Sequence, residues 1–173
     1  MNTSPDQDQR YLDAAASYGP ALQRLARASE ANPERARDLL QDMHVALWRS
    51  LAGFDGRCSL KTWVYRVAHN TAASHVGREQ RRNAGAVSLE AAGELSDASS
   101  LTREIETSDA LARLNAWVRR LQPPDRQVIT LYLEDISAAE IAEITGFTPG
   151  AVATRISRLK AQLAADFKEA AHD

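Results

Sequence analysis

Apolar residues recur at intervals of three and four along most of the chain, which is the spacing of the buried face of an amphipathic α-helix. The pattern is clearest after Asn32-Pro33-Glu34, which is typical of a helix start because asparagine caps free amides and proline suits the first turn. The apolar positions of this predicted helix are Ala36, Leu39, Leu40, Met43, Leu47 and Leu51. Polar residues occupy the other positions, so we expect one side of the helix to be buried and the other exposed.

Two further helices are predicted on either side of this one. The stretch from Gln9 to Ala28 carries an approximate apolar stripe that Gly19-Pro20 interrupts, so a break or kink is expected there. After a turn at Asp55-Gly56, Ser59 can cap a third helix. Its predicted buried face consists of Leu60, Trp63, Val64, Val67, Ala68 and Thr71. Its predicted outward face consists of Lys61, Tyr65, Arg66, His69, Asn70 and Ala73.

The second half of the chain predicts a helix-turn-helix, preceded by helices over 109–121 and 125–133. Ser137 and Glu140 have the spacing of a capping box, and the short helix that they open ends at Gly146. Thr148 then caps a longer helix. Its apolar positions are Val152, Ile156, Leu159 and Leu163. Two helices joined by so short a turn are typical of a DNA-binding helix-turn-helix, and a plain helical hairpin is the alternative.

Composition agrees with a helical globular protein. Of the 173 residues, 44% are hydrophobic, 25% are charged and only 6% are aromatic, so strand-favouring residues are few. No apolar stretch reaches the roughly 18 to 20 residues that cross a bilayer, and the polar N-terminus is unlike a signal peptide. We therefore predict an all-α fold, no membrane insertion and a cytoplasmic location.

Charge divides the chain into two modules and a connecting segment. Residues 57–82 contain six lysines and arginines and one acid, whereas residues 83–109 contain six acids and one arginine. The acidic stretch is also rich in alanine, serine and glycine, a composition typical of a linker. We therefore predict helical domains over residues 8–83 and 107–170, joined by a flexible acidic linker over residues 84–106.

Both modules carry features that suit nucleic-acid binding. The outward face of the third helix combines cations, an aromatic ring and an amide. Cations can bind phosphates, the ring can stack on bases, and the amide can form hydrogen bonds with base edges. A solvated helix face is the alternative. The last helix has no acid from Val152 to Leu163, and its outward face is small, polar and positive. Such a face can approach the major groove closely, which favours DNA binding over a plain hairpin.

Eight segments together resemble one known family. They are DLLQD at 38–42, LWR at 47–49, FDGR at 54–57, TWVYRVAHN at 62–70, LQPPDR at 121–126, EIAE at 140–143, GAV at 150–152 and RISRL at 155–159. In this order and spacing they resemble the extracytoplasmic-function (ECF) sigma factors, small two-domain specificity subunits of bacterial RNA polymerase. The resemblance implies a protein that binds core polymerase, recognises and melts a promoter, and catalyses no reaction itself.

The resemblance also implies a role for each surface. The core polymerase, through its β′ clamp helices and β subunit, would contact Asp38, Gln41, Asp42 and Arg49. The non-template strand of the minus-ten element would contact Phe54, Arg57, Lys61, Arg66 and Asn70. The minus-thirty-five element would contact Thr148, Ala151, Thr154, Arg155 and Arg158. An anti-sigma protein is a further partner that the family analogy suggests.

Two other classes of function compete with this one. A helix-turn-helix regulator that binds duplex DNA without joining polymerase remains the alternative, although such a protein does not need the basic helix of the first module. An enzyme is disfavoured because no nucleophile elbow, phosphate-binding loop or metal cluster occurs in the sequence. The single cysteine, Cys58, and the four histidines do not have zinc-ligand spacing, so no metal or cofactor is expected.

Overall fold

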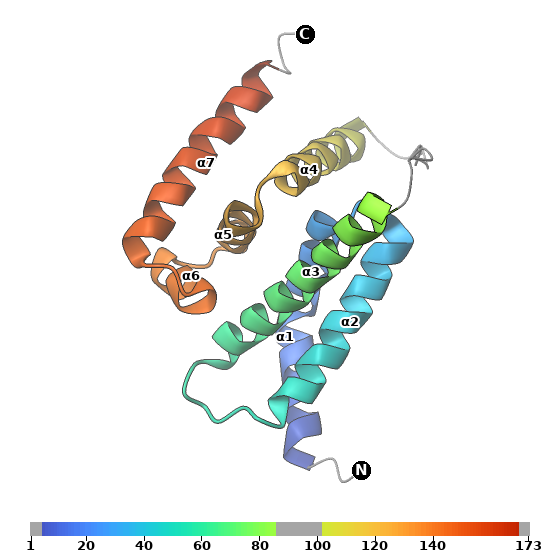
Figure 1. Cartoon of the computed structure of the whole chain (residues 1–173), viewed down its shortest axis with the longest axis vertical. Coiled ribbons are helices and arrows are strands. Elements are labelled where there is room, and N and C mark those ends of the chain that lie inside the picture. Colours follow the sequence, from blue (N-terminus) through green and yellow to red (C-terminus); the bar gives the residue numbers. More distant parts are fainter. Residues whose placement is uncertain (1–4, 86–101, 170–173) are drawn as a thin grey trace.

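The computed structural model describes residues 5–85 and 102–169, and all the regular structure in these ranges is α-helical (Figure 1). The all-α prediction is thereby confirmed for this part of the chain. The helices are α1 (Pro5–Ser29), α2 (Pro33–Leu51), α3 (Leu60–Gly85), α4 (Thr102–Arg120), α5 (Pro123–Leu133), α6 (Ala138–Thr145) and α7 (Pro149–Glu169). Within the described ranges, no helix is both long and apolar enough to cross a membrane.

The first three helices form an N-terminal module in which each helix packs against the other two. Its centre contains fully buried side chains from all three helices: Leu22, Leu39, Met43, Leu47, Leu51 and Val64. The predicted caps are confirmed, since Asn32 Oδ1 accepts from the amides of Glu34 and Arg35 at 3.0 Å. Ser59 Oγ likewise accepts from the amide of Thr62 at 3.1 Å.

Of the break or kink predicted at Gly19-Pro20, the break is wrong, because α1 continues through both residues. Pro20 cannot donate to the carbonyl of Ala16, one turn earlier. Both Ala16 and Pro20 are exposed, so water can satisfy that carbonyl, and the helix is held by the apolar residues that it buries on its other side.

The last four helices form a C-terminal module, and α6 and α7 are its predicted helix-turn-helix. The capping box between Ser137 and Glu140 is present in full, and Gly146 ends α6 with a φ of 79°, in the left-handed region that glycine adopts readily. Thr148 Oγ1 accepts from the amide of Ala151 at 3.2 Å at the start of α7. Most of the predicted linker, residues 86–101, lies outside the described residues, and α4 begins within the remainder of it at Thr102.

The two modules pack directly against each other. Ala21 and Tyr65 of the first module belong to the same buried cluster as Val128 and Ile141 of the second. The guanidinium of Arg24 donates to both carboxylate oxygens of Glu134, at 2.7 and 2.6 Å. As Figure 1 shows, α6 lies against α3, whereas α7 lies on the side of its module away from α1 to α3. The arrangement covers part of α3 and leaves the outer face of α7 open.

Candidate functional site

One candidate surface is the polar face of α2. Asp38, Gln41, Asp42 and Arg49 are all exposed there, because the apolar residues between them turn into the module core. Asp42 and Arg49 also line a shallow hollow between α2 and α3, together with Asn70 and Arg78. The carboxylate of Asp42 lies 3.6 Å from the guanidinium of Arg78. The structure thus brings two of the four residues predicted to bind polymerase next to Asn70, which is predicted to bind the minus-ten strand.

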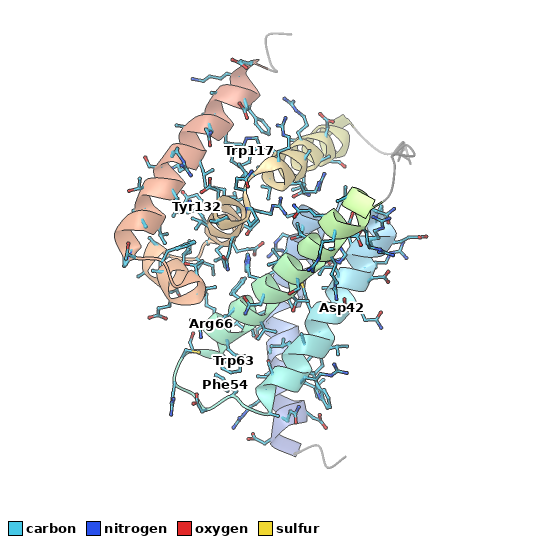
Figure 2. All side chains as sticks on the ribbon, in the orientation of Figure 1. Asp42, Phe54, Trp63, Arg66, Trp117 and Tyr132 are labelled. Carbon is cyan, nitrogen blue, oxygen red and sulfur yellow. The ribbon has the colours of Figure 1, made fainter. Side chains whose placement is uncertain are left out.

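The loop between α2 and α3 presents two more of the predicted residues. The ring of Phe54 is half-buried and meets the ring of Trp63 edge-on, with 5.3 Å between centroids. Figure 2 labels both side chains near the start of α3. The guanidinium of Arg10 lies 5.9 Å from the Phe54 ring centroid on another side. Arg57, by contrast, has 90% of its side chain exposed. Phe54 therefore anchors the loop, while the exposed guanidinium of Arg57, which pairs with Asp55 at 3.0 Å, remains open to a ligand.

The other two cations of the predicted minus-ten surface contact the C-terminal module. Lys61 Nζ lies 2.9 Å from Glu140 Oε1, and Arg66 Nη2 donates to the main-chain oxygen of Glu143 at 2.7 Å. Both acceptors belong to α6, which faces Arg66 in Figure 2. In this conformation both cations are held by the C-terminal module, which limits the approach of a DNA strand to them.

The outward orientation predicted for Tyr65 and His69 is wrong. Both side chains are buried, at 5% and 7% exposure, because the C-terminal module covers the side of α3 that the first module leaves open. Burial raises the pKa of Tyr65 to about 12 and lowers the pKa of His69 to about 4, since each charged form is poorly solvated there. These residues belong to an interface between modules, and His69 is neutral at pH 7.

Glu140 has a different electrostatic environment at the same interface. Hydrogen bonds from Lys61 and from the side chain and amide of Ser137 hold the pKa of Glu140 at about 2. The carboxylate therefore closes the capping box of α6 and binds α3 at the same time. It remains ionised at every pH at which the protein would be handled.

The third candidate surface is the outer face of α7. Thr148, Ala151, Thr154 and Arg158 are exposed, and Arg155 is half-buried, as the helical spacing predicts. Val152 and Leu159 are fully buried beneath them against the rest of the module. The five predicted minus-thirty-five residues therefore share one accessible face.

Sequence reasoning missed Asp125, which binds two of those five residues. Its Oδ1 lies 2.5 Å from Arg155 Nη1, and both of its oxygens lie 2.7 Å from Arg158 Nη2. Asp125 is the single acid in the first turn of α5, thirty residues before Arg155. Nothing in the local sequence indicates that it meets α7, because the contact depends on how α5 and α7 pack.

Comparison with known proteins identifies both modules. The family model of Sigma-70 region 2 matches residues 14–82, and that of Sigma-70, region 4 matches residues 111–163. The ECF RNA polymerase sigma-E factor of Haemophilus influenzae is 31% identical over 131 residues, covering 71% of this chain and 69% of that protein. The RNA polymerase sigma factor NccH of Alcaligenes xylosoxydans xylosoxydans is 29% identical over 151 residues, covering 86% of this chain and 81% of that protein.

Solved structures agree with this assignment. CnrH, solved in complex with the cytosolic domain of CnrY, superposes with a TM-score of 0.66 at 25% identity, covering 92% of this chain and 88% of that one. The sigma factor RpoE of Bartonella quintana, solved with the anti-sigma factor NepR, shares the fold with a TM-score of 0.68 at 23% identity, covering 91% and 96%. Two family models in the expected order, and relatives along most of the chain, show that this protein belongs to the ECF sigma factors of RNA polymerase and acts in transcription initiation.

Proposed function

We propose that the three candidate surfaces divide the work of a sigma factor. The exposed face of α2, with Asp38, Gln41, Asp42 and Arg49, binds core polymerase through the β′ clamp helices. Its four side chains carry both signs of charge on one helix face, which suits an electrostatically complementary contact with another protein. The adjacent hollow, which Asn70 also lines, would let polymerase and the promoter strand be held side by side.

The loop after α2 and the start of α3 capture the non-template strand of the minus-ten element. Arg57 and Asn70 are exposed in the structure, and Lys61 and Arg66 join them when α6 moves away. Cations track the phosphates and polar groups reach the separated bases. Holding bases out of the stack costs a few kcal/mol per step, which these contacts would offset. The polymerase then performs the chemistry, so this chain needs no catalytic residue of its own.

The outer face of α7 reads the minus-thirty-five element in duplex DNA. The observation that carries this assignment is the accessible face itself, on which Thr154, Arg155 and Arg158 stand above a buried apolar stripe. Arginine can pair with guanine edges in the major groove, and hydroxyls can reach phosphate oxygens. The face stays open even while the modules are packed together.

A protein inhibitor is a further proposed partner. CnrH is described with the cytosolic domain of CnrY, and RpoE of Bartonella quintana with an anti-sigma factor. We infer that an anti-sigma protein holds this chain in a similar way. Because its work is done on RNA polymerase, we also infer that it acts in the cytoplasm.

Paired variants test the division of work, each serving as the control for the other. Asp38→Ala combined with Gln41→Ala should weaken binding to core polymerase about tenfold or more while the isolated protein keeps its affinity for minus-thirty-five duplex. Arg158→Ala should leave polymerase binding intact and lower promoter-dependent initiation about fivefold or more, the range expected for one lost arginine–base contact. The assignment would be refuted if the Asp38 and Gln41 variant lost duplex affinity as much as polymerase binding. It would also be refuted if Arg158→Ala lost polymerase binding as much as initiation.

A further inference from the structure

The contact between Asp125 and α7 lies directly behind the proposed minus-thirty-five surface. One carboxylate accepts hydrogen bonds from both arginines of that surface, with Oδ1 shared between Arg155 and Arg158 and Oδ2 taken by Arg158 alone. Asp125 is 18% exposed, whereas Arg155 and Arg158 keep 32% and 54% of their side chains exposed. The acid is thus sheltered while part of each guanidinium stays accessible.

The backbone around Asp125 is also well fixed. Pro123 and Pro124 occupy the first turn of α5, and proline restricts the chain there. The next residue, Arg126, donates to the main-chain oxygens of Arg119 and Leu121 at 2.6 and 3.0 Å, which ties the end of α4 to α5. Asp125 therefore projects from a rigid corner between two helices.

Arg155 has a second contact that restricts it further. Its guanidinium lies 5.1 Å from the centroid of the Phe147 ring, which belongs to the turn between α6 and α7. A guanidinium held by a carboxylate on one side and a ring on another has little freedom to reorient. Its position on α7 is therefore set by residues of α5 and of the turn as well as by its own helix.

From this geometry we propose that Asp125 is a positioning residue for minus-thirty-five recognition, an inference that rests on the proposed function of α7. It orients the two guanidiniums so that their remaining N–H groups face the groove in one arrangement, and it offsets one of their two positive charges. Orientation sharpens the preference for the correct base, because arginine discriminates bases through a fixed pair of hydrogen bonds. Because Asp125 offsets one positive charge, it also weakens the attraction of this surface to phosphates. Phosphates are the same in every DNA sequence, so this effect does not depend on the bases.

Loss of the Asp125 charge should affect base preference and general affinity for DNA differently. Asp125→Asn keeps the size of the side chain but removes its charge, so base preference should fall while affinity for unrelated duplex stays equal or rises. Asp135→Asn is the matched control, because Asp135 is an exposed acid of the same module in the turn after α5. Its φ of 57° is a conformation that asparagine also tolerates, so this variant removes the same charge without altering the contact with α7.

Run-off transcription with a randomised promoter measures the preference directly. The full chain is assembled with bacterial core polymerase on the promoter upstream of its own gene, in which the minus-thirty-five segment is randomised and each template carries a transcribed barcode. Sequencing the transcripts gives the base preference at every position. Arg155→Ala and Arg158→Ala first locate the positions that these arginines read, and thermal unfolding followed by circular dichroism checks that each variant folds.

We expect Asp125→Asn to lower base preference about fivefold at those positions and nowhere else, as for loss of one well-oriented arginine contact. Asp135→Asn should keep the wild-type preference. Asp125→Glu, which keeps the charge but moves it by one methylene group, should give a smaller loss at the same positions. In a chain that already lacks both arginines, Asp125→Asn should change nothing further, because Asp125 acts through them.

The inference is overturned if Asp125→Asn and Asp125→Glu both keep the wild-type preference, or if they lower transcription from all templates alike. A different result is expected if α7 does not read the minus-thirty-five element at all. In that case the wild-type chain shows no base preference in this segment, or keeps its preference when Arg155 and Arg158 are both replaced by alanine.

Discussion

His69 is a titratable side chain within the contact between the two modules. It lines two hollows between α3 and the helices of the C-terminal module, of which Arg126 lines one and Glu134 the other. Burial lowers its pKa to about 4 from 6.5, so the folded protein holds it neutral where an unfolded chain would bind a proton. The free energy of unfolding therefore keeps its full value above pH 6.5. It falls as the pH is lowered toward 4, because the unfolded chain takes up the proton more readily than the folded protein does.

We therefore expect the free energy of unfolding to fall by roughly 2 kcal/mol between pH 7 and pH 5 on account of His69 alone. Urea unfolding at both pH values measures this, with His69→Asn as the variant that cannot titrate. The wild-type chain should lose more stability over this interval than the variant does. Equal losses in the two proteins would show that His69 is not buried as the structure places it.

At the scale of the element, the sequence predicts most of the helices because their start and stop signals are local. Asn32, Ser59, Ser137 and Thr148 all cap the helices that they were expected to cap, and Gly146 ends α6 as expected. Each signal acts within a few residues of itself, so no knowledge of packing is needed to interpret it.

Contacts between elements could not be predicted in the same way. The prediction of which residues of α3 face outward holds for the first module alone. The second module then buries Tyr65 and His69. The pairing of Asp125 with Arg155 and Arg158 likewise depends on packing between helices thirty residues apart. Periodicity identifies which side of a helix is apolar, but it does not show which polar side chains a distant helix covers.

The capping box of α6 should contribute measurably to the stability of the chain. Ser137→Ala removes the acceptor for the amide of Glu140 and one hydrogen bond that holds the Glu140 carboxylate, so it should destabilise the chain by about 1 kcal/mol. The midpoint of thermal unfolding should fall by about 2–4 °C. Ser157→Ala, on the exposed face of α7, should leave the midpoint nearly unchanged. Equal shifts in the two variants would contradict a capping role for Ser137.

For the whole molecule, the packing of the two modules leaves one proposed promoter-binding surface open and covers part of the other. The face of α7 is accessible, whereas Lys61 and Arg66 are bound to α6. If the proposed assignment holds, the minus-ten strand competes with the protein's own C-terminal module for Lys61 and Arg66. We expect the modules to separate when the chain engages promoter DNA on the polymerase.

Glu134→Gln combined with Glu140→Gln should favour the separated form, because it weakens the ion pairs with Arg24 and Lys61. Exposed ion pairs contribute about 0.2–1 kcal/mol each, so the shift is up to about 2 kcal/mol. Small-angle X-ray scattering should show a larger radius of gyration for this variant. Glu143→Gln is the control, because Arg66 binds the main-chain oxygen of that residue and not its side chain. An unchanged radius in the double variant would show that the apolar contacts alone hold the modules.

A sigma factor makes core polymerase start transcription at a promoter, so binding to core polymerase and a promoter-dependent transcript should be measured together. The purified protein is mixed with sigma-free bacterial core polymerase, the complex is isolated by gel filtration, and run-off transcription is performed from the promoter upstream of its own gene. Co-elution followed by a single defined transcript is the result that we predict. A protein that shifts duplex DNA but neither co-elutes with core polymerase nor yields a transcript would contradict the account.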